Sequence, residues 1–144
     1  MKRTSGVIDL LGGTRGLGKR VSSEKELVVS LHEGLPYRAL ESVKRRLRLS
    51  DSELAEAIGM HPRTLARRKS QARLRAGESD RLSRLARVTS RAIEALGSEE
   101  NALAWLRHSN RALAGATPLR YLRTDLGARR IEAILSHIEF GDLS

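Results

Sequence analysis

The sequence has no cysteine and very few aromatic residues. None of its 144 residues is a cysteine, so neither a disulfide nor a cysteine-ligated metal site can form. This absence fits a reducing compartment, and we expect a cytoplasmic protein. The aromatic residues are one Trp, two Tyr and one Phe, so the core must be built from Leu, Ile, Val and Ala. Because aromatic residues are enriched in strands, this composition favours packed helices.

Long apolar runs are missing as well. No stretch is long enough for a membrane span, and no apolar region of a secretory signal is found. Hydrophobic residues still make up 40% of the chain, which is enough to bury a core. The length suits one compact unit, or two small units that share a core.

The net charge of +10 is unevenly distributed. Residues 1–92 carry 21 Lys and Arg against 10 Asp and Glu, a net charge of +11, whereas residues 93–144 carry 6 against 7, a net charge of −1. A basic segment joined to a neutral one indicates a site for a polyanion on the first and another kind of site on the second. The alternative is a well-solvated basic surface.

Residues 1–21 are predicted to be a flexible, basic arm. Its glycines lie among Lys and Arg residues, and the run Val7–Leu11 is its one apolar stretch. Such a segment has little to bury, so we expect it to be mobile in solution and dispensable for partner binding.

The remainder predicts an all-α fold in two domains, at residues 22–78 and 79–144. Ser23 with Glu26 and Ser50 with Glu53 are spaced as capping boxes, which open helices. The pair Ala76-Gly77 is expected to break the helix that begins at Pro62, before a long helix capped by Ser79 or Asp80. A final helix is expected from about 125 to 140. Its inward residues should be Ile131, Ile134, Leu135 and Ile138.

Residues 50–73 predict a helix-turn-helix unit. A short helix with Leu54 and Ile58 inward is followed by Gly59 and by a second helix that begins at Pro62. The second helix of such units enters the major groove of DNA, where Arg pairs well with guanine and with phosphate. The alternative is an ordinary basic helix on a helical bundle. The residues predicted to contact DNA are Arg63, Thr64, Arg67, Arg68, Lys69 and Arg73.

No motif argues for an enzyme or for a cofactor. The segment Gly13–Arg20 resembles a phosphate-binding loop, but Arg20 stands where Ser or Thr should hold Mg²⁺, and no βαβ pattern follows. The four histidines are far apart and lack the spacing of metal ligands. We expect neither a cofactor nor a metal.

The C-terminal part carries several short motifs in a fixed order. They are Asp80-Arg81-Leu82, Ala104-Trp105-Leu106, Asn110-Arg111-Ala112-Leu113, Gly115-x-x-Pro118-Leu119, Leu122-x-Thr124-x-x-Gly127 and Ile138-Glu139-x-Gly141. With Leu65-Ala66-Arg67-Arg68 in the upstream helix-turn-helix, this order resembles the MbcA/ParS/Xre antitoxins over roughly residues 25–144. The resemblance implies an Xre-like helix-turn-helix domain followed by a small helical ParS-like domain.

The resemblance also implies the partners. The usual one is a RES-domain toxin, which depletes NAD⁺ and which the antitoxin holds inactive through its C-terminal domain. The helix-turn-helix commonly binds operator DNA and represses the antitoxin's own operon. The antitoxin is itself no enzyme. The alternative is a plain helix-turn-helix regulator whose C-terminal half only dimerises.

Residues 110–144 are predicted to bind the toxin, because they combine Arg and aromatic residues with few acids. We expect the acidic end of the chain to block the electropositive mouth of a NAD-binding cleft. The alternative is a frayed end and a toxin held by the helix face alone. The early part of the chain has more apolar residues than one small domain must bury, including Leu27, Val28 and Leu31. We therefore expect a homodimer. The residues predicted to contact the toxin are Tyr121, Arg123, Arg130, His137, Glu139, Phe140, Asp142 and Ser144.

Overall fold

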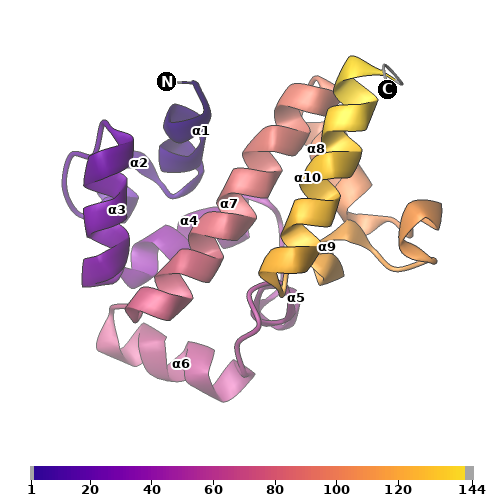
Figure 1. Cartoon of the computed structure of the whole chain (residues 1–144). Coiled ribbons are helices and arrows are strands. Elements are labelled where there is room, and N and C mark those ends of the chain that lie inside the picture. Colours follow the sequence, from indigo (N-terminus) through magenta and orange to yellow (C-terminus); the bar gives the residue numbers. More distant parts are fainter. Residues whose placement is uncertain (1, 142–144) are drawn as a thin grey trace.

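The computed structural model describes residues 2–141 (Figure 1). Over this range the fold is all-helical, as predicted, and a single bridge between Pro36 and Arg73 is the one extended pairing in it. The elements in chain order are α1 (Lys2–Leu10), α2 (Gly13–Leu17), α3 (Glu24–Glu33), α4 (Tyr37–Arg46), α5 (Asp51–Ala57), α6 (Pro62–Gln71), α7 (Ala76–Leu96), α8 (Glu99–Arg107), the 3₁₀ turn η1 (Arg111–Leu113), α9 (Pro118–Tyr121) and α10 (Asp125–Phe140).

The 21-residue helix α7 runs through the middle of the molecule (Figure 1). Helices α1, α3, α8 and α10 pack against it, and Leu82, Leu85 and Val88 form its buried stripe. It begins at Ala76, so Ala76-Gly77 forms the start of this helix and does not separate it from the helix before. The Glu78 carboxylate accepts a hydrogen bond from the Arg75 backbone N–H at 2.8 Å and holds the first turn. The prediction of a later start, at Ser79 or Asp80, is therefore wrong.

The N-terminal segment is folded, which corrects the prediction of a flexible arm over residues 1–21. Helix α1 packs against α7 and α4, and α2 packs against α4. Leu10, Leu11 and Leu17 are at most 3% exposed. A Cβ on Gly16 would lie 2.0 Å from the Leu11 carbonyl oxygen, so this glycine permits close packing. The glycines that suggested mobility thus allow the first two helices to approach the core.

Helices α5 and α6 form the predicted helix-turn-helix unit. The Ser50 hydroxyl accepts a hydrogen bond from the Glu53 N–H at 3.1 Å, and the Glu53 carboxylate accepts one from the Ser50 N–H at 2.9 Å. Gly59 lies in the turn with a φ of +64°, which favours glycine. Pro62 occupies the first turn of α6, and Leu65 anchors that helix in the core at 3% exposure.

In the C-terminal half, α8 and α10 pack against α7, and α9 packs against α5, α8 and α10. The Thr124 hydroxyl caps α10 by accepting a hydrogen bond from the Gly127 N–H at 3.0 Å. Gly127 is needed there, because a Cβ would lie 1.9 Å from the Tyr121 carbonyl oxygen. Ile131 and Leu135 are fully buried as predicted, whereas Ile138 is 42% exposed because the last turn of α10 extends beyond the core. No helix of the described range is long and apolar enough to cross a membrane.

Candidate functional site

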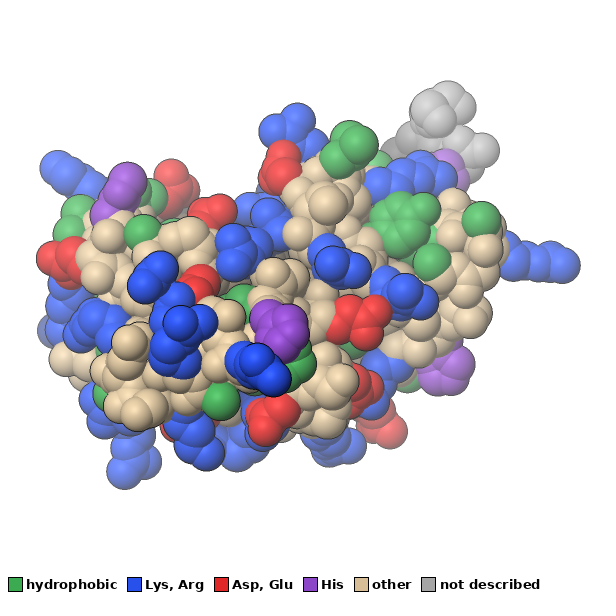
Figure 2. Space-filling view, turned by 90° about the horizontal axis from the view of Figure 1, so that it is seen from below, with side chains coloured by type: hydrophobic (Ala, Val, Ile, Leu, Met, Phe, Trp, Pro, Cys, Tyr) green, Lys and Arg blue, Asp and Glu red, His purple; other side chains and the backbone are tan. Residues whose placement is uncertain are grey.

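Helix α6 presents a basic, solvent-exposed surface. Arg63, Arg67 and Lys69 are exposed, and Thr64 is half-buried with its hydroxyl 3.4 Å from an Arg67 guanidinium nitrogen. In the view from below, the side on which α6 lies, Lys and Arg side chains are spread over the face with fewer Asp and Glu among them (Figure 2). This surface has the charge that a nucleic-acid backbone requires.

Arg68 is the exception on α6, and its predicted contact with DNA is wrong. Its side chain is 4% exposed, and its Nε lies 2.7 Å from a Glu78 carboxylate oxygen. A second guanidinium nitrogen donates to the side-chain oxygen of Gln71 at 3.1 Å. The guanidinium therefore joins α6 to the first turn of α7 and cannot face a phosphate. Arg73, just after α6, remains exposed although it donates to the Gly34 carbonyl.

A second surface lies where α9 turns into α10. An open hollow of about 1030 Å³ is bordered by the turn before α6, by α7, by α9 and by the first two turns of α10. It brings together three of the residues predicted to bind a toxin, which are Tyr121, Arg123 and Arg130. We call this feature the α10 hollow. Its lining residues are Gly59, Arg81, Arg120, Tyr121, Arg123, Thr124, Leu126, Gly127, Arg129 and Arg130.

Two arginines of α7 fix the walls of the α10 hollow. Arg81 donates from its Nε to the Ile58 carbonyl at 2.7 Å, next to the turn of the helix-turn-helix. The buried Arg84 donates to the carbonyls of Leu122 and Arg123 at 3.1 and 2.8 Å. These contacts hold the turn before α6 and the turn before α10 against the same face of α7.

The last turn of α10 lies about 14 Å along the helix axis from Arg130. Here Arg91 of α7 contacts the Glu139 carboxylate at 2.5 Å, and its guanidinium lies 5.8 Å from the centre of the Phe140 ring. Glu139 is thus engaged within the chain, whereas His137 is exposed and Phe140 is 59% exposed. The other two residues predicted to bind the toxin, Asp142 and Ser144, lie outside the described residues.

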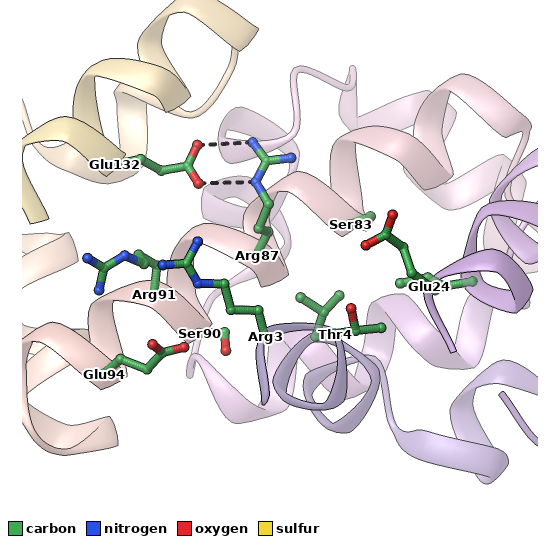
Figure 3. Close-up of a pocket in the computed structure, with 11 residues that line it drawn as sticks. Arg3, Thr4, Glu24, Ser83, Arg87, Ser90, Arg91, Glu94 and Glu132 are labelled. Carbon is green, nitrogen blue, oxygen red and sulfur yellow. Dashed lines mark hydrogen bonds and ion pairs between the residues drawn. The ribbon is translucent and has the colours of Figure 1, made fainter. Parts of the chain in front are cut away.

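A smaller pocket, of about 300 Å³, lies between α1, α3, α7 and α10 (Figure 3). Val7 and Leu27 contribute apolar walls, and basic and acidic side chains both line it. Arg87 of α7 faces Glu132 of α10 with two contacts of 3.2 Å. This ion pair fixes the middle of α10 against α7. Across residues 2–141, no group of three or more His, Asp or Glu could hold a metal ion.

Two family models match the chain and divide it at the end of the basic half. Residues 26–87 match the antitoxin Xre-like helix-turn-helix domain, and residues 91–141 match the antitoxin Xre/MbcA/ParS C-terminal toxin-binding domain. The chain belongs to the Xre/MbcA/ParS family of antitoxins. The α10 hollow and the last turn of α10 lie within the second match, apart from Gly59 and Arg81.

Two relatives of this antitoxin extend over nearly the same length. Antitoxin Xre of Photorhabdus laumondii subsp. laumondii is 29% identical over 132 residues, covering 90% of this chain and 89% of that protein. Antitoxin Xre of Yersinia enterocolitica is 26% identical with the same coverage. A chain in the crystal structure of the M. tuberculosis MbcT-MbcA toxin-antitoxin complex matches 86% of this chain and all of its own length, with a TM-score of 0.52 and 23% identity. That likeness shows the fold.

Several residues of the antitoxin's surfaces cannot be predicted from the sequence. Arg120 and Leu126 line the α10 hollow, and Leu126 is 80% exposed. A leucine in the first turn of an amphipathic helix gives no signal that it faces solvent. Arg84 and Arg91 were equally hidden, because a buried arginine has the same sequence context as an exposed one.

Proposed function

We propose that this antitoxin neutralises a RES-domain toxin, an enzyme that depletes NAD⁺, by binding it directly through the C-terminal domain. The observation that carries the proposal is the match of residues 91–141 to a toxin-binding domain, on a segment that presents the α10 hollow and an exposed Phe140. Since NAD⁺ and the operon are both in the cytoplasm, we propose that the antitoxin acts there.

The last turn of α10 is the second toxin contact in this proposal. Phe140 and Ile138 are 59% and 42% exposed, and exposed apolar side chains of this size anchor protein interfaces. Arg91 engages Glu139, so the blocking carboxylate in the proposal is that of Asp142, with Ser144 as a further contact. The exposed His137 lies on the same turn.

We propose further that the antitoxin binds its operator as a homodimer and represses its own operon. The exposed basic residues of α6 support the DNA contact. Of the residues from which the dimer was predicted, Leu27 is buried in the chain's own core at 7% exposure and Leu31 is half-buried. The exposed apolar residues left on α3 are Val28 at 45% and Val29 at 46%, and a second copy of the chain would cover them. Helix-turn-helix proteins commonly read two half-sites as dimers. Light scattering without toxin should give twice the chain mass, and a monomer mass at tens of micromolar would contradict the dimer.

Co-purification tests the toxin-binding proposal. The tagged full chain would be co-expressed with the product of the adjacent gene and eluted at increasing salt. We expect both proteins to elute in a fixed ratio and to remain together in gel filtration. An antitoxin that elutes alone, yet still binds its promoter, would instead indicate a plain transcription regulator.

A further inference from the structure

The α10 hollow carries an excess of positive charge. Five of its lining residues are arginines, and no acidic residue lines it in the described part of the chain. Two of the arginines are paired at the rim, Arg120 with Glu56 and Arg129 with Asp125, both at 2.9 Å. Arg123 and Arg130 have no carboxylate partner within residues 2–141. Arg81 also lacks a carboxylate partner there but donates to the Ile58 carbonyl, so Arg123 and Arg130 are the two guanidinium groups that the hollow offers to a partner.

The position of the hollow strengthens its positive potential. It lies at the N-terminal end of the 16-residue helix α10, where the aligned peptide dipoles leave partial positive charge. The Thr124 hydroxyl satisfies the N–H of Gly127, so a partner would feel the field of the helix end without replacing its cap. Both contributions favour an anionic side chain over a neutral one.

Apolar surface distinguishes a protein partner from a nucleic acid. Leu126 is 80% exposed and lines the hollow together with the half-buried Tyr121. Protein interfaces are enriched in Arg and Tyr around apolar contacts. A phosphate backbone would leave the Leu126 side chain without an apolar contact. The combination thus matches a peptide segment that carries both carboxylates and an apolar side chain.

We infer that the α10 hollow receives an acidic segment of the toxin, with its carboxylates on Arg123 and Arg130 and an apolar side chain against Leu126. This inference rests on the proposed function, because it names the chemistry of the toxin surface that the C-terminal domain binds. It also assigns the contact to the first turns of α10, separate from the last turn and the end of the chain.

Charge reversal in the hollow tests the inference. The double variant Arg123→Glu/Arg130→Glu and the single variant Leu126→Asp change exposed side chains near the start of α10, where added carboxylates suit the helix dipole. Arg111→Glu makes a single charge reversal of the same kind at an exposed site of the same domain, outside the hollow. Far-UV circular dichroism melts of all variants verify that they are folded. The probe is the adjacent-gene product, purified from its complex with the unchanged antitoxin.

The readouts are the Kd and the association rate at about 50 and 300 mM salt. We expect the double variant to weaken binding by about tenfold or more, chiefly through slower association, and to flatten the salt dependence. Leu126→Asp should weaken binding by removing the apolar contact, and it should flatten the salt dependence less than the double variant, because it adds one negative charge to the hollow whereas the double variant reverses two positive ones. Arg111→Glu should stay within about twofold of the unchanged chain, because Arg111 does not line the hollow.

Three results would overturn the inference, each in a different way. If the hollow variants bind the toxin as tightly as Arg111→Glu does, the hollow is not part of the toxin interface, and the proposed function is unaffected. Hollow variants that keep toxin binding but lose affinity for every DNA sequence alike would mean that the arginines contact phosphate. An unchanged antitoxin that captures no adjacent-gene product would refute the proposed function, and the inference would fall with it.

Discussion

At the residue scale, the Arg68–Glu78 pair determines how α6 is held. Both side chains are less than 10% exposed, so neither charge has access to bulk water. Burial alone would raise the pKa of Glu78, but hydrogen bonds from Arg68 and from the Arg75 backbone N–H outweigh it, and the pKa lies below its ordinary value of 4.5. The carboxylate is therefore charged at neutral pH and keeps α6 attached to α7.

Replacing Glu78 tests this attachment. Glu78→Gln should lower the free energy of unfolding by about 3–5 kcal/mol at neutral pH, because Arg68 remains buried without a counter-charge. The pKa of Glu78 is lowered by folding, so its contribution is complete above pH 4.5 and is lost as the pH falls from 4.5 through the folded pKa. Urea unfolding of both chains across this range should show their stabilities converging at acid pH. The exposed Glu100→Gln serves as control, and a constant gap at all pH values would contradict the assignment.

At the element scale, α6 has one buried arginine, Arg68, and two exposed ones, Arg63 and Arg67. Arg67→Ala should cost about 1–3 kcal/mol of binding to one operator base pair if it contacts guanine. Arg73→Ala should weaken binding to all sequences alike and reduce the salt slope by about 1. Gel shifts over a salt series, with and without the toxin, measure both effects. Absence of any salt-dependent affinity for the promoter would exclude DNA binding by α6.

Helices α1 and α2 show where sequence reasoning succeeds and where it stops. The cap at Ser50 and the turn at Gly59 are local, so spacing alone predicts the helix-turn-helix. The burial of Leu11 depends instead on α4 and α7, which lie far along the chain. In the sequence, Gly6 and Gly16 look like markers of flexibility. In the structure, a Cβ on Gly6 would clash with the Ser90 side chain, and a Cβ on Gly16 would clash with the Leu11 carbonyl. Only the folded arrangement reveals that these glycines make room for a neighbour.

Truncating Leu11 tests whether these helices belong to the core. Leu11→Ala should destabilise the antitoxin by about 2–5 kcal/mol, because the side chain is fully buried and leaves a cavity. The same change at the exposed Leu126 should alter stability by about 0.5 kcal/mol or less. Thermal melts of the two variants compare equal chemistry at different burial. If Leu11→Ala and Leu126→Ala melt at the same temperature, residues 1–21 are a dispensable arm and do not belong to the core.

At the scale of the whole molecule, α7 unites the two functional halves. The matched domains meet near its middle, at residues 87 and 91, and the expected division at residues 78 and 79 falls inside its first turn. One hydrophobic core extends from Val7 to Leu135. Arg81 and Arg84 bind the turns that precede α6 and α10 to the same helix. The basic surface of α6 and the α10 hollow are therefore parts of one packed unit.

The most direct measurement of the central claim is NAD⁺ consumption by the purified toxin during titration with the full-length antitoxin. Direct neutralisation predicts that NAD⁺ loss falls linearly with added antitoxin and stops at a fixed molar ratio, because the two proteins form a stable complex. Chains lacking residues 142–144 and chains carrying Arg123→Glu/Arg130→Glu should need more antitoxin to reach the same inhibition, whereas Arg111→Glu should not. NAD⁺ loss that continues unchanged at a large molar excess of antitoxin would contradict the account.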